Sequence, residues 1–259
     1  HVPCNACRYC LSGNHTVCET LHTSNFDPGG FAEYVRVPHI NVARGTFVLP
    51  DEMTFEDGTF IEPLACVIRG QRVARLQPAQ SVLILGSGIS GLIHLLLARA
   101  SGAARVIATD INEYRLRKAK EFGADAVIDA REDVPARVRE LNENRLADLV
   151  IVCAGAFPAF SQALKSVDRG GTVLCFAPTD PGVELPIPVN DFWRNSITVL
   201  PSYANSPYDA MVAIEMIRAG HVPVHKMITH RLGLAETGLG FKLVAAGEES
   251  IKVIIEPQR

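Results

Sequence analysis

The chain has 259 residues, of which 47% are hydrophobic and 20% charged, and its formal net charge is −3. This composition is typical of a globular protein with one or two domains. A weakly acidic chain without a Lys/Arg run lacks the charge that attracts nucleic acids or membrane surfaces, so we expect neither as a partner. The longest apolar run, residues 92–98, is too short to span a bilayer. Cysteines that we expect to be reduced indicate a cytoplasmic protein.

Four cysteines gather near the start of the chain. Cys4, Cys7 and Cys10 are separated by two residues each, and Cys18 follows after a further seven. A C-x-x-C step brings two thiolates within reach of one ion, and four thiolates complete a tetrahedral Zn²⁺ shell with no open position. The alternative is a set of buried or redox-active cysteines. We therefore predict one structural zinc held by these four residues.

The first part of the chain shows no long helical period. Residues 1–61 contain β-type segments punctuated by Gly and Pro, such as FAEYVRV at 31–37. Glu62 and Pro63 then indicate the start of a helix, because Pro is favoured in the first helical turn. This helix is expected to run through IEPLACVIRGQRVARL.

From residue 80 the pattern alternates between short apolar strands and amphipathic helices. A wholly apolar run such as SVLILG is typical of a strand buried on both faces. The expected strands are 81–86, 105–110, 125–129, 148–155, 170–178 and 196–203, and the expected helices are 91–102, 113–123, 135–145 and 158–167. Repeated βαβ units predict an α/β fold with a doubly wound parallel sheet. Beyond residue 203, one helix (208–220) and a final strand (250–257) are expected.

The segment GSGISG joins the first of these strands to the helix that follows. Gly86 permits a tight turn, Gly88 lets a pyrophosphate approach the backbone, and Gly91 lets the helix pack closely on the strand. Ile89 and Ser90 open the helix, whose N-terminus favours negative charge. A glycine-rich turn without a ligand is the alternative. We predict that these five residues bind a dinucleotide.

Asp110 ends the second strand, nineteen residues beyond Gly91. A carboxylate there accepts hydrogen bonds from the adenosine ribose hydroxyls and repels a 2′-phosphate, so NAD is the expected cofactor rather than NADP. Arg115, five residues later, either packs against the adenosine end or is a surface arginine on an amphipathic helix, and we favour the first interpretation.

Further cofactor contacts are expected where the last three parallel strands end. In such sheets ligands bind at the carboxyl ends of the strands, although any one of these residues can equally be a core or turn residue. The residues concerned are Cys153, Ala154, Phe176, Ala177, Ser202 and Tyr203.

Taken together, these motifs identify a family. The C-x-x-C-x-x-C-x₇-C segment, GGFAEYV, and a GxGxxG sheet with an acid after its second strand resemble the medium-chain zinc-dependent alcohol dehydrogenases. IEPLACVIRG, RLRKAKEFGAD and MITHRLGL resemble the polyol (sorbitol-like) and threonine dehydrogenase branch. The resemblance covers the whole chain. It implies a partial GroES-like, β-rich catalytic domain at 1–70 with the structural zinc lobe, a Rossmann NAD-binding domain at 71–203, and a return to the catalytic domain at 204–259.

The resemblance also implies a second, catalytic zinc that polarises the substrate hydroxyl before hydride passes to the nicotinamide. Glu62 matches the family's glutamate in the EPL segment. That glutamate lies close to the catalytic metal, either as a ligand or in contact with a ligand. A carboxylate favoured by a helix N-terminus is the alternative for Glu62. The family's Cys and His-Glu ligands have no match here. We therefore expect the chain to be the C-terminal portion of a longer protein and to bind NAD without oxidising a substrate.

For the intact protein we expect an NAD-dependent dehydrogenase of a secondary alcohol on a small polar substrate, and a homo-oligomer (dimer or tetramer). Sorbitol dehydrogenases commonly carry arginine at the position of Ser202, so sorbitol itself is not favoured. Polyols, cyclitols, amino-sugar precursors and β-hydroxy amino acids remain open. The alternatives are a zinc-free medium-chain reductase and a non-catalytic NAD-binding fragment.

Overall fold

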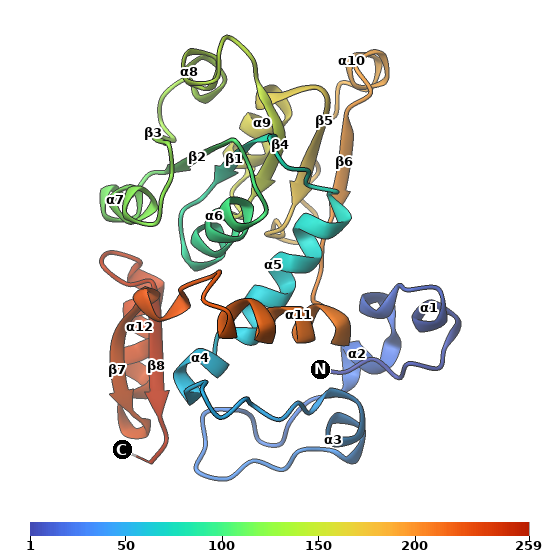
Figure 1. Cartoon of the computed structure of the whole chain (residues 1–259), viewed down its shortest axis with the longest axis vertical. Coiled ribbons are helices and arrows are strands. Elements are labelled where there is room, and N and C mark those ends of the chain that lie inside the picture. The colour runs from blue at the N-terminus through green and yellow to red at the C-terminus, as the bar shows by residue number, and fades with distance from the viewer. Residues whose placement is uncertain (259) are drawn as a thin grey trace. The chain divides into compact units, whose positions relative to one another are not determined.

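The computed structural model describes residues 1–258, shown in Figure 1. The chain divides into two compact units. One consists of His1–Arg69 together with Tyr203–Arg259, and the other consists of Gly70–Ser202.

A six-stranded, wholly parallel sheet forms the centre of the second unit. Its strand order is β3-β2-β1-β4-β5-β6, so the direction of winding reverses between β1 and β4. The strands are β1 (Ser81–Leu85), β2 (Arg105–Asp110), β3 (Ala126–Asp129), β4 (Ala147–Val152), β5 (Val167–Cys175) and β6 (Thr198–Pro201). The predicted doubly wound α/β fold is confirmed, and each strand overlaps its expected segment.

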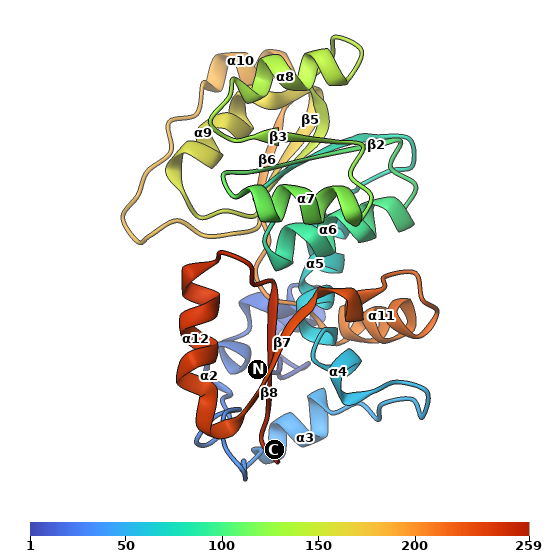
Figure 2. The same cartoon turned by 90° about the vertical axis from the view of Figure 1, so that its left-hand side faces the viewer.

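Helices cover both faces of this sheet, as Figure 2 shows: α6 and α7 lie on one face, and α8, α9 and α10 on the other. Their bounds are α6 (Ile89–Ala100), α7 (Glu113–Glu121), α8 (Val134–Leu141), α9 (Phe157–Ser166) and α10 (Val189–Arg194). On the second face, strand residues such as Leu83 and Val150 form one core with Val138 of α8 and Phe160 of α9. This apolar core holds the strands rigidly while their ends stay free for polar groups.

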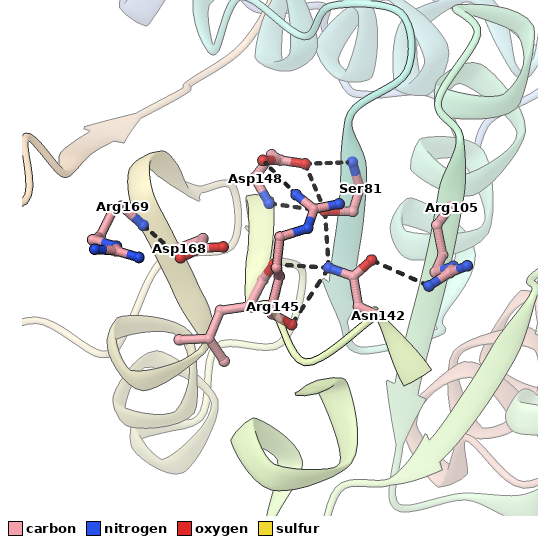
Figure 3. Close-up of polar contacts among 8 residues, drawn as sticks. Ser81, Arg105, Asn142, Arg145, Asp148, Asp168 and Arg169 are labelled. Carbon is pink, nitrogen blue, oxygen red and sulfur yellow. Dashed lines mark hydrogen bonds and ion pairs between the residues drawn. The ribbon is translucent and has the colours of Figure 1, made fainter. Parts of the chain in front are cut away.

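A polar network ties the amino ends of β1 and β4, as Figure 3 shows. The backbone N–H and the hydroxyl of Ser81 both donate to Asp148 Oδ2 at 2.7 Å. The buried Asn142 donates to Ser81 Oγ at 3.2 Å and to the carbonyl of Leu146 at 2.8 Å. Because polar groups buried at this depth must be paired, the network fixes the register of the two strands that border the reversal point.

The first unit contains more helix than strand. Its helices are α1 (Arg8–Leu11), α2 (Glu19–Thr23), α3 (His39–Gly45), α4 (Phe55–Gly58), α11 (Pro207–Arg218) and α12 (Thr237–Ala246), with 3₁₀ turns η1 (His15–Val17), η2 (Val224–Met227) and η3 (Leu234–Glu236). The predicted helix at Glu62 is α5 (Ile61–Val73), which carries the chain into the second unit. Strands β7 (Ile228–Gly233) and β8 (Lys252–Glu256) pair in parallel.

Two expectations for the secondary structure were wrong or incomplete. FAEYVRV is not a strand: within the described residues, 31–37 make only an isolated antiparallel bridge between Arg36 and Asp27. A β-type segment becomes a strand only when a partner satisfies its backbone N–H and C=O groups. The sequence analysis also missed α10, β7 and α12, of which β7 contains three polar residues among its six and lacks a clean alternation.

The described residues include no helix that is both long enough and apolar enough to cross a membrane.

Candidate functional site

Two of the three glycines of GSGISG, Gly86 and Gly91, are required by the geometry of the strand-to-helix turn. Gly86 has φ +101°, in the region that favours glycine. A Cβ on Gly91 would overlap the carbonyl oxygen of Gly86 and lie 3.0 Å from its carbonyl carbon. The start of α6 therefore touches the end of β1 directly, so the first turn of the helix stands at the carboxyl edge of the sheet.

Gly88 occupies the N-cap position of α6, and no side chain caps the helix there. A Cβ on Gly88 would meet no atom within 4 Å, so the backbone beside it is open. The first N–H groups of a helix lack partners within the helix and attract negative charge. This end of α6 can accept a phosphate group.

Asp110 is held at the carboxyl end of β2 by the phosphate loop itself. Ser87 N–H donates to its Oδ2 at 2.8 Å and Asn112 N–H donates to its Oδ1 at 2.9 Å, while the side chain is only 6% exposed. Both oxygens keep acceptor capacity for a ligand. Arg115 Nη1 lies 3.9 Å from Oδ2, and the Arg115 side chain is partly buried.

The carboxyl ends of β1, β4 and β5 meet next to the same loop. Cys153 N–H donates to the carbonyl of Leu85 at 2.8 Å, and a Cβ on Gly86 would lie 3.1 Å from Ala154 Cβ. The N–H groups of Phe176 and Ala177 both donate to the carbonyl of Val152, at 3.2 and 2.9 Å. Burial raises the pKa of the Cys153 thiol, so this side chain is neutral.

Ser202 and Tyr203 fall on either side of the boundary between the two units. Ser202 N–H donates to the carbonyl of Cys175 at 3.1 Å, and its buried Oγ has no hydrogen-bond partner among the described residues. Tyr203 belongs to the first unit, is 59% exposed and meets the ring of His22 edge-on at 5.7 Å.

The four N-terminal cysteines form a cluster. All their sulfur atoms lie within 4.8 Å of one another, and Cys7 Sγ lies 3.5 Å from Cys10 Sγ. A tetrahedral zinc with bonds of about 2.3 Å needs sulfur pairs about 3.8 Å apart, so a small adjustment would accommodate the ion. Cys10 and Cys18 are buried together with Leu21.

Backbone donors support negative charge on two of these sulfurs. The N–H groups of Ala6 and Cys7 point at Cys4 Sγ and lower the pKa of its thiol. Burial raises the pKa of Cys18, but N–H donors from Cys4 and Leu21 outweigh it, and the result is a pKa of about 6. Burial raises the pKa of Cys10 to about 12. The donor set matches the thiolate chemistry that zinc prefers.

Glu62 stands apart from that cluster, in the first turn of α5. It borders a cavity of about 440 Å³ that Asn205 and Pro207 also line. Cys66 Sγ donates to Glu62 Oε1 at 3.1 Å and receives a hydrogen bond from Asn205 at 3.4 Å. Burial raises the pKa of the Cys66 thiol to about 12, which keeps it a donor. Within residues 1–258, the four-cysteine cluster is the only group of three or more metal-ligating side chains, so Glu62 belongs to none.

The sequence analysis missed two contributors to the site. Ser87 lies inside GSGISG and supplies both the N–H to Asp110 and a hydroxyl that donates to the carbonyl of Thr109 at 3.0 Å. Asn112 caps α7 and also donates its N–H to Asp110. The order acid, one residue, Asn, helix is an N-cap signal and was visible in the sequence.

Comparison with known proteins agrees with this geometry. Residues 90–219 match the family of zinc-binding dehydrogenases. The chain is 32% identical over 235 residues to an uncharacterised zinc-type alcohol dehydrogenase-like protein of Escherichia coli, covering 88% of this chain and 65% of that protein. It is 31% identical to a sorbitol dehydrogenase of Bombyx mori and 30% identical to an L-threonine 3-dehydrogenase of Bacillus licheniformis, with 99% of this chain and 73% of each protein covered.

Solved structures give the same result. An alcohol dehydrogenase from Thermus sp. ATN1 superposes with a TM-score of 0.88 at 26% identity, over 98% of this chain and 75% of that one. A Sinorhizobium meliloti protein described as a zinc-binding dehydrogenase, with NADP bound, superposes with a TM-score of 0.86 at 28% identity, over 99% of this chain and 74% of that one.

The parallel sheet with its phosphate loop is the arrangement by which Rossmann-type proteins bind dinucleotides. The chain belongs to the zinc-dependent alcohol dehydrogenase family, and it spans about two thirds to three quarters of the length of these relatives. The resemblance seen in the sequence is confirmed, and the relatives are alcohol, polyol and threonine dehydrogenases.

Two single substitutions separate packing from phosphate binding. Gly91→Ala places a methyl group against Gly86, so we expect the free energy of unfolding to fall by about 1–3 kcal/mol. Gly88→Ala meets open space, so thermal stability should be unchanged, while NADH affinity should fall at least about tenfold because the methyl group occupies the phosphate approach. Calorimetry and NADH titration measure both. A Gly88→Ala protein that binds NADH normally would contradict the phosphate position.

Removing one thiolate tests the metal centre. Cys7→Ser should lower the zinc content from about one per chain to near zero and lower the melting temperature, because binding energy of a structural zinc is folding energy. NADH affinity should change less than about twofold, since the phosphate loop lies in the other unit. Cys175→Ser, in β5, is the matched control and should keep the metal. Absence of zinc from the unmutated protein in elemental analysis would defeat the assignment.

Proposed function

We propose that the intact protein is a zinc-dependent oxidoreductase that transfers hydride from a secondary alcohol of a small polar substrate to NAD. The observation that carries the proposal is the carboxylate of Asp110, clamped by two backbone N–H groups at the edge of an open phosphate loop. Such a carboxylate accepts hydrogen bonds from ribose hydroxyls and repels a 2′-phosphate. The residues 86, 88–91, 110 and 115 would hold the adenosine and pyrophosphate, and 153–154 and 176–177 would border the nicotinamide.

Two metal ions enter the proposal in different ways. Cys4, Cys7, Cys10 and Cys18 would hold a structural zinc with no open position. A catalytic zinc, when bound, acts as a Lewis acid that lowers the pKa of the substrate hydroxyl. Glu62 would support that ion from the first turn of α5, and its bond from Cys66 keeps the carboxylate oriented toward one side of the helix.

Relatives and residues together limit the substrate class. The compared proteins are named for sorbitol, D-xylulose and L-threonine, which share a secondary hydroxyl on a small polar carbon chain. We infer a polyol, a cyclitol or a β-hydroxy amino acid. Ser202, buried with an unpaired hydroxyl, cannot supply the charge-assisted hydrogen bond of an arginine, and this disfavours sorbitol.

One observation favours a second candidate for residues 1–259 taken by themselves. Glu62 has no set of partner ligands within the described residues, so these residues alone would form a non-catalytic NAD-binding fragment. A zinc-free reductase of the same superfamily has less support, because four clustered thiols have no use in it.

Location and assembly follow from the same chemistry. All seven cysteines are free, which supports the reducing environment of the cytoplasm. Among the described residues β6 pairs only with β5, and Trp193 of α10, five residues before β6, is 77% exposed. An open sheet edge with an exposed aromatic side chain supports a homo-oligomer, a dimer or tetramer.

Substitution of Asp110 tests the choice of cofactor. Asp110→Ala should weaken NAD binding about ten- to a hundredfold, since a charge-assisted hydrogen bond is worth about 1.5–3 kcal/mol, and it should narrow the preference over NADP. Titration calorimetry with both nucleotides gives the two dissociation constants. Asp168→Ala, at the amino end of β5, is the matched control and should bind both normally. Tighter binding of NADP than of NAD by the unmutated protein would overturn the proposal.

Substitution of Glu62 tests the dehydrogenase itself. In the intact protein, Glu62→Gln should reduce turnover at least about tenfold while the NAD dissociation constant changes less than about twofold, because the residue supports the metal and not the nucleotide. NADH formation is followed on cyclitols, sugar alcohols and threonine. Glu215→Gln, an exposed carboxylate on α11, is the control and should keep full turnover. If the protein binds NAD but no secondary alcohol is oxidised, the fragment interpretation replaces the enzyme.

A further inference from the structure

The helix that follows the phosphate loop contains a buried imidazole that has no role in the proposed chemistry. His94 lies in α6 and is 0% exposed. Gln71 Nε2, from the end of α5, donates to the backbone carbonyl of His94 at 2.8 Å and lies 3.2 Å from its Nδ1. An amide nitrogen only donates, so Nδ1 is the acceptor and the ring proton is on Nε2. Gln71 therefore fixes both the tautomer and the orientation of the ring.

This ring stands against one of the strand-end residues. The rings of His94 and Phe176 meet edge to face, with centroids 4.5 Å apart and an interplanar angle of 90°. Gly70 closes the third side: a Cβ there would lie 3.3 Å from Phe176 Cδ2 and 3.4 Å from His94 Cε1. The ring of Phe176 is therefore bordered by Gly70 of α5 and by His94 of α6.

Packing alone is a poor account of this arrangement. His94 Nε2 and Gln71 Oε1 are both buried without a hydrogen-bond partner among the described residues. Buried unpaired polar atoms destabilise a fold, and burial lowers the pKa of His94 to about 3. Leucine would fill a similar volume without the unpaired ring nitrogen. What leucine lacks is a flat ring in a fixed orientation that can pack edge to face with Phe176.

The position of Phe176 matters because of where β5 ends. A dinucleotide lies across the point where the strand order reverses, here between β1 and β4. Asp110 on β2 assigns the adenosine half to one side of that point. The nicotinamide half consequently falls on the side of β4 and β5, and Phe176 is the first residue after β5.

We propose that His94, oriented by Gln71, is a positioning residue that holds Phe176 and thereby shapes the nicotinamide end of the site. The inference rests on the proposed function. Because the His94 ring contacts Gln71 and Phe176, we expect its effect to fall on the nicotinamide half of the cofactor. Loss of the ring should weaken NAD binding and leave ADP-ribose, which lacks only the nicotinamide, unaffected.

The test is a double-mutant cycle on the intact protein. His94→Leu should weaken NAD binding about three- to tenfold, change ADP-ribose binding less than about twofold, and leave the melting temperature unchanged or raised. In a Phe176→Ala background the same substitution should have no further effect on NAD. His94→Phe, which keeps an aromatic edge, should restore most of the affinity. His225→Leu, at an exposed histidine, is the control.

Two outcomes would overturn the inference: equal loss of NAD and ADP-ribose affinity, or additive effects in the cycle. Neither affects the proposed function, which fails separately if the unmutated protein binds no dinucleotide. In that case NMR of labelled Phe176 in the free protein decides the inference. The ring should flip slowly in the unmutated protein and in His94→Phe, and fast in His94→Leu. Equal flip rates in all three would refute the positioning role.

Discussion

The contact between Gly91 and Gly86 is the constraint on which the second unit depends. α6 can start in contact with the end of β1 only because both positions are glycine and carry no side chain. This close approach places the first turn of α6 at the carboxyl edge of the sheet. It also places Ser87 where its N–H donates to Asp110. The phosphate loop, Asp110 and α6 are therefore structurally coupled, and we expect a substitution in one of them to shift the other two.

The phosphate loop, Asp110 and α6 were largely predictable from the sequence, because the sequence features that indicate them are local. A wholly apolar run, three glycines at fixed spacing and an acid at the end of the next strand need no knowledge of distant residues. The contacts made by Ser87 and Asn112 were harder to foresee, since their side chains resemble ordinary loop and cap residues and their role lies in backbone N–H groups. The pairing of Gln71 with His94 was not predictable, because it joins two helices and neither sequence segment indicates which residue of the other it meets.

The first unit was predicted less well, for a physical reason. The spacing of Cys4 to Cys18 reports a local cluster, and the four sulfurs do gather. FAEYVRV has the composition of a strand, but pairing is a property of two segments, and the described residues supply no second one. Strand β7 is the opposite case. Its mixed polarity does not indicate a strand, but it pairs in parallel with β8, some twenty residues later. Glu62 was located by resemblance to a family motif, and its environment of Cys66 and Asn205 came only from the structure.

The order in which the chain is synthesised has a consequence for the four-cysteine cluster. Ala204 packs against the cluster of Cys10, Cys18 and Leu21, and Arg69 donates to Thr16 Oγ1 at 3.0 Å. A ribosome makes the four thiols first and residue 204 about ten to forty seconds later, at ordinary elongation rates of about 5–20 residues per second. During that interval the thiols have their ligand spacing but lack their packing. The nascent chain thus exposes four thiols at ligand spacing well before the residues that cover them have been made.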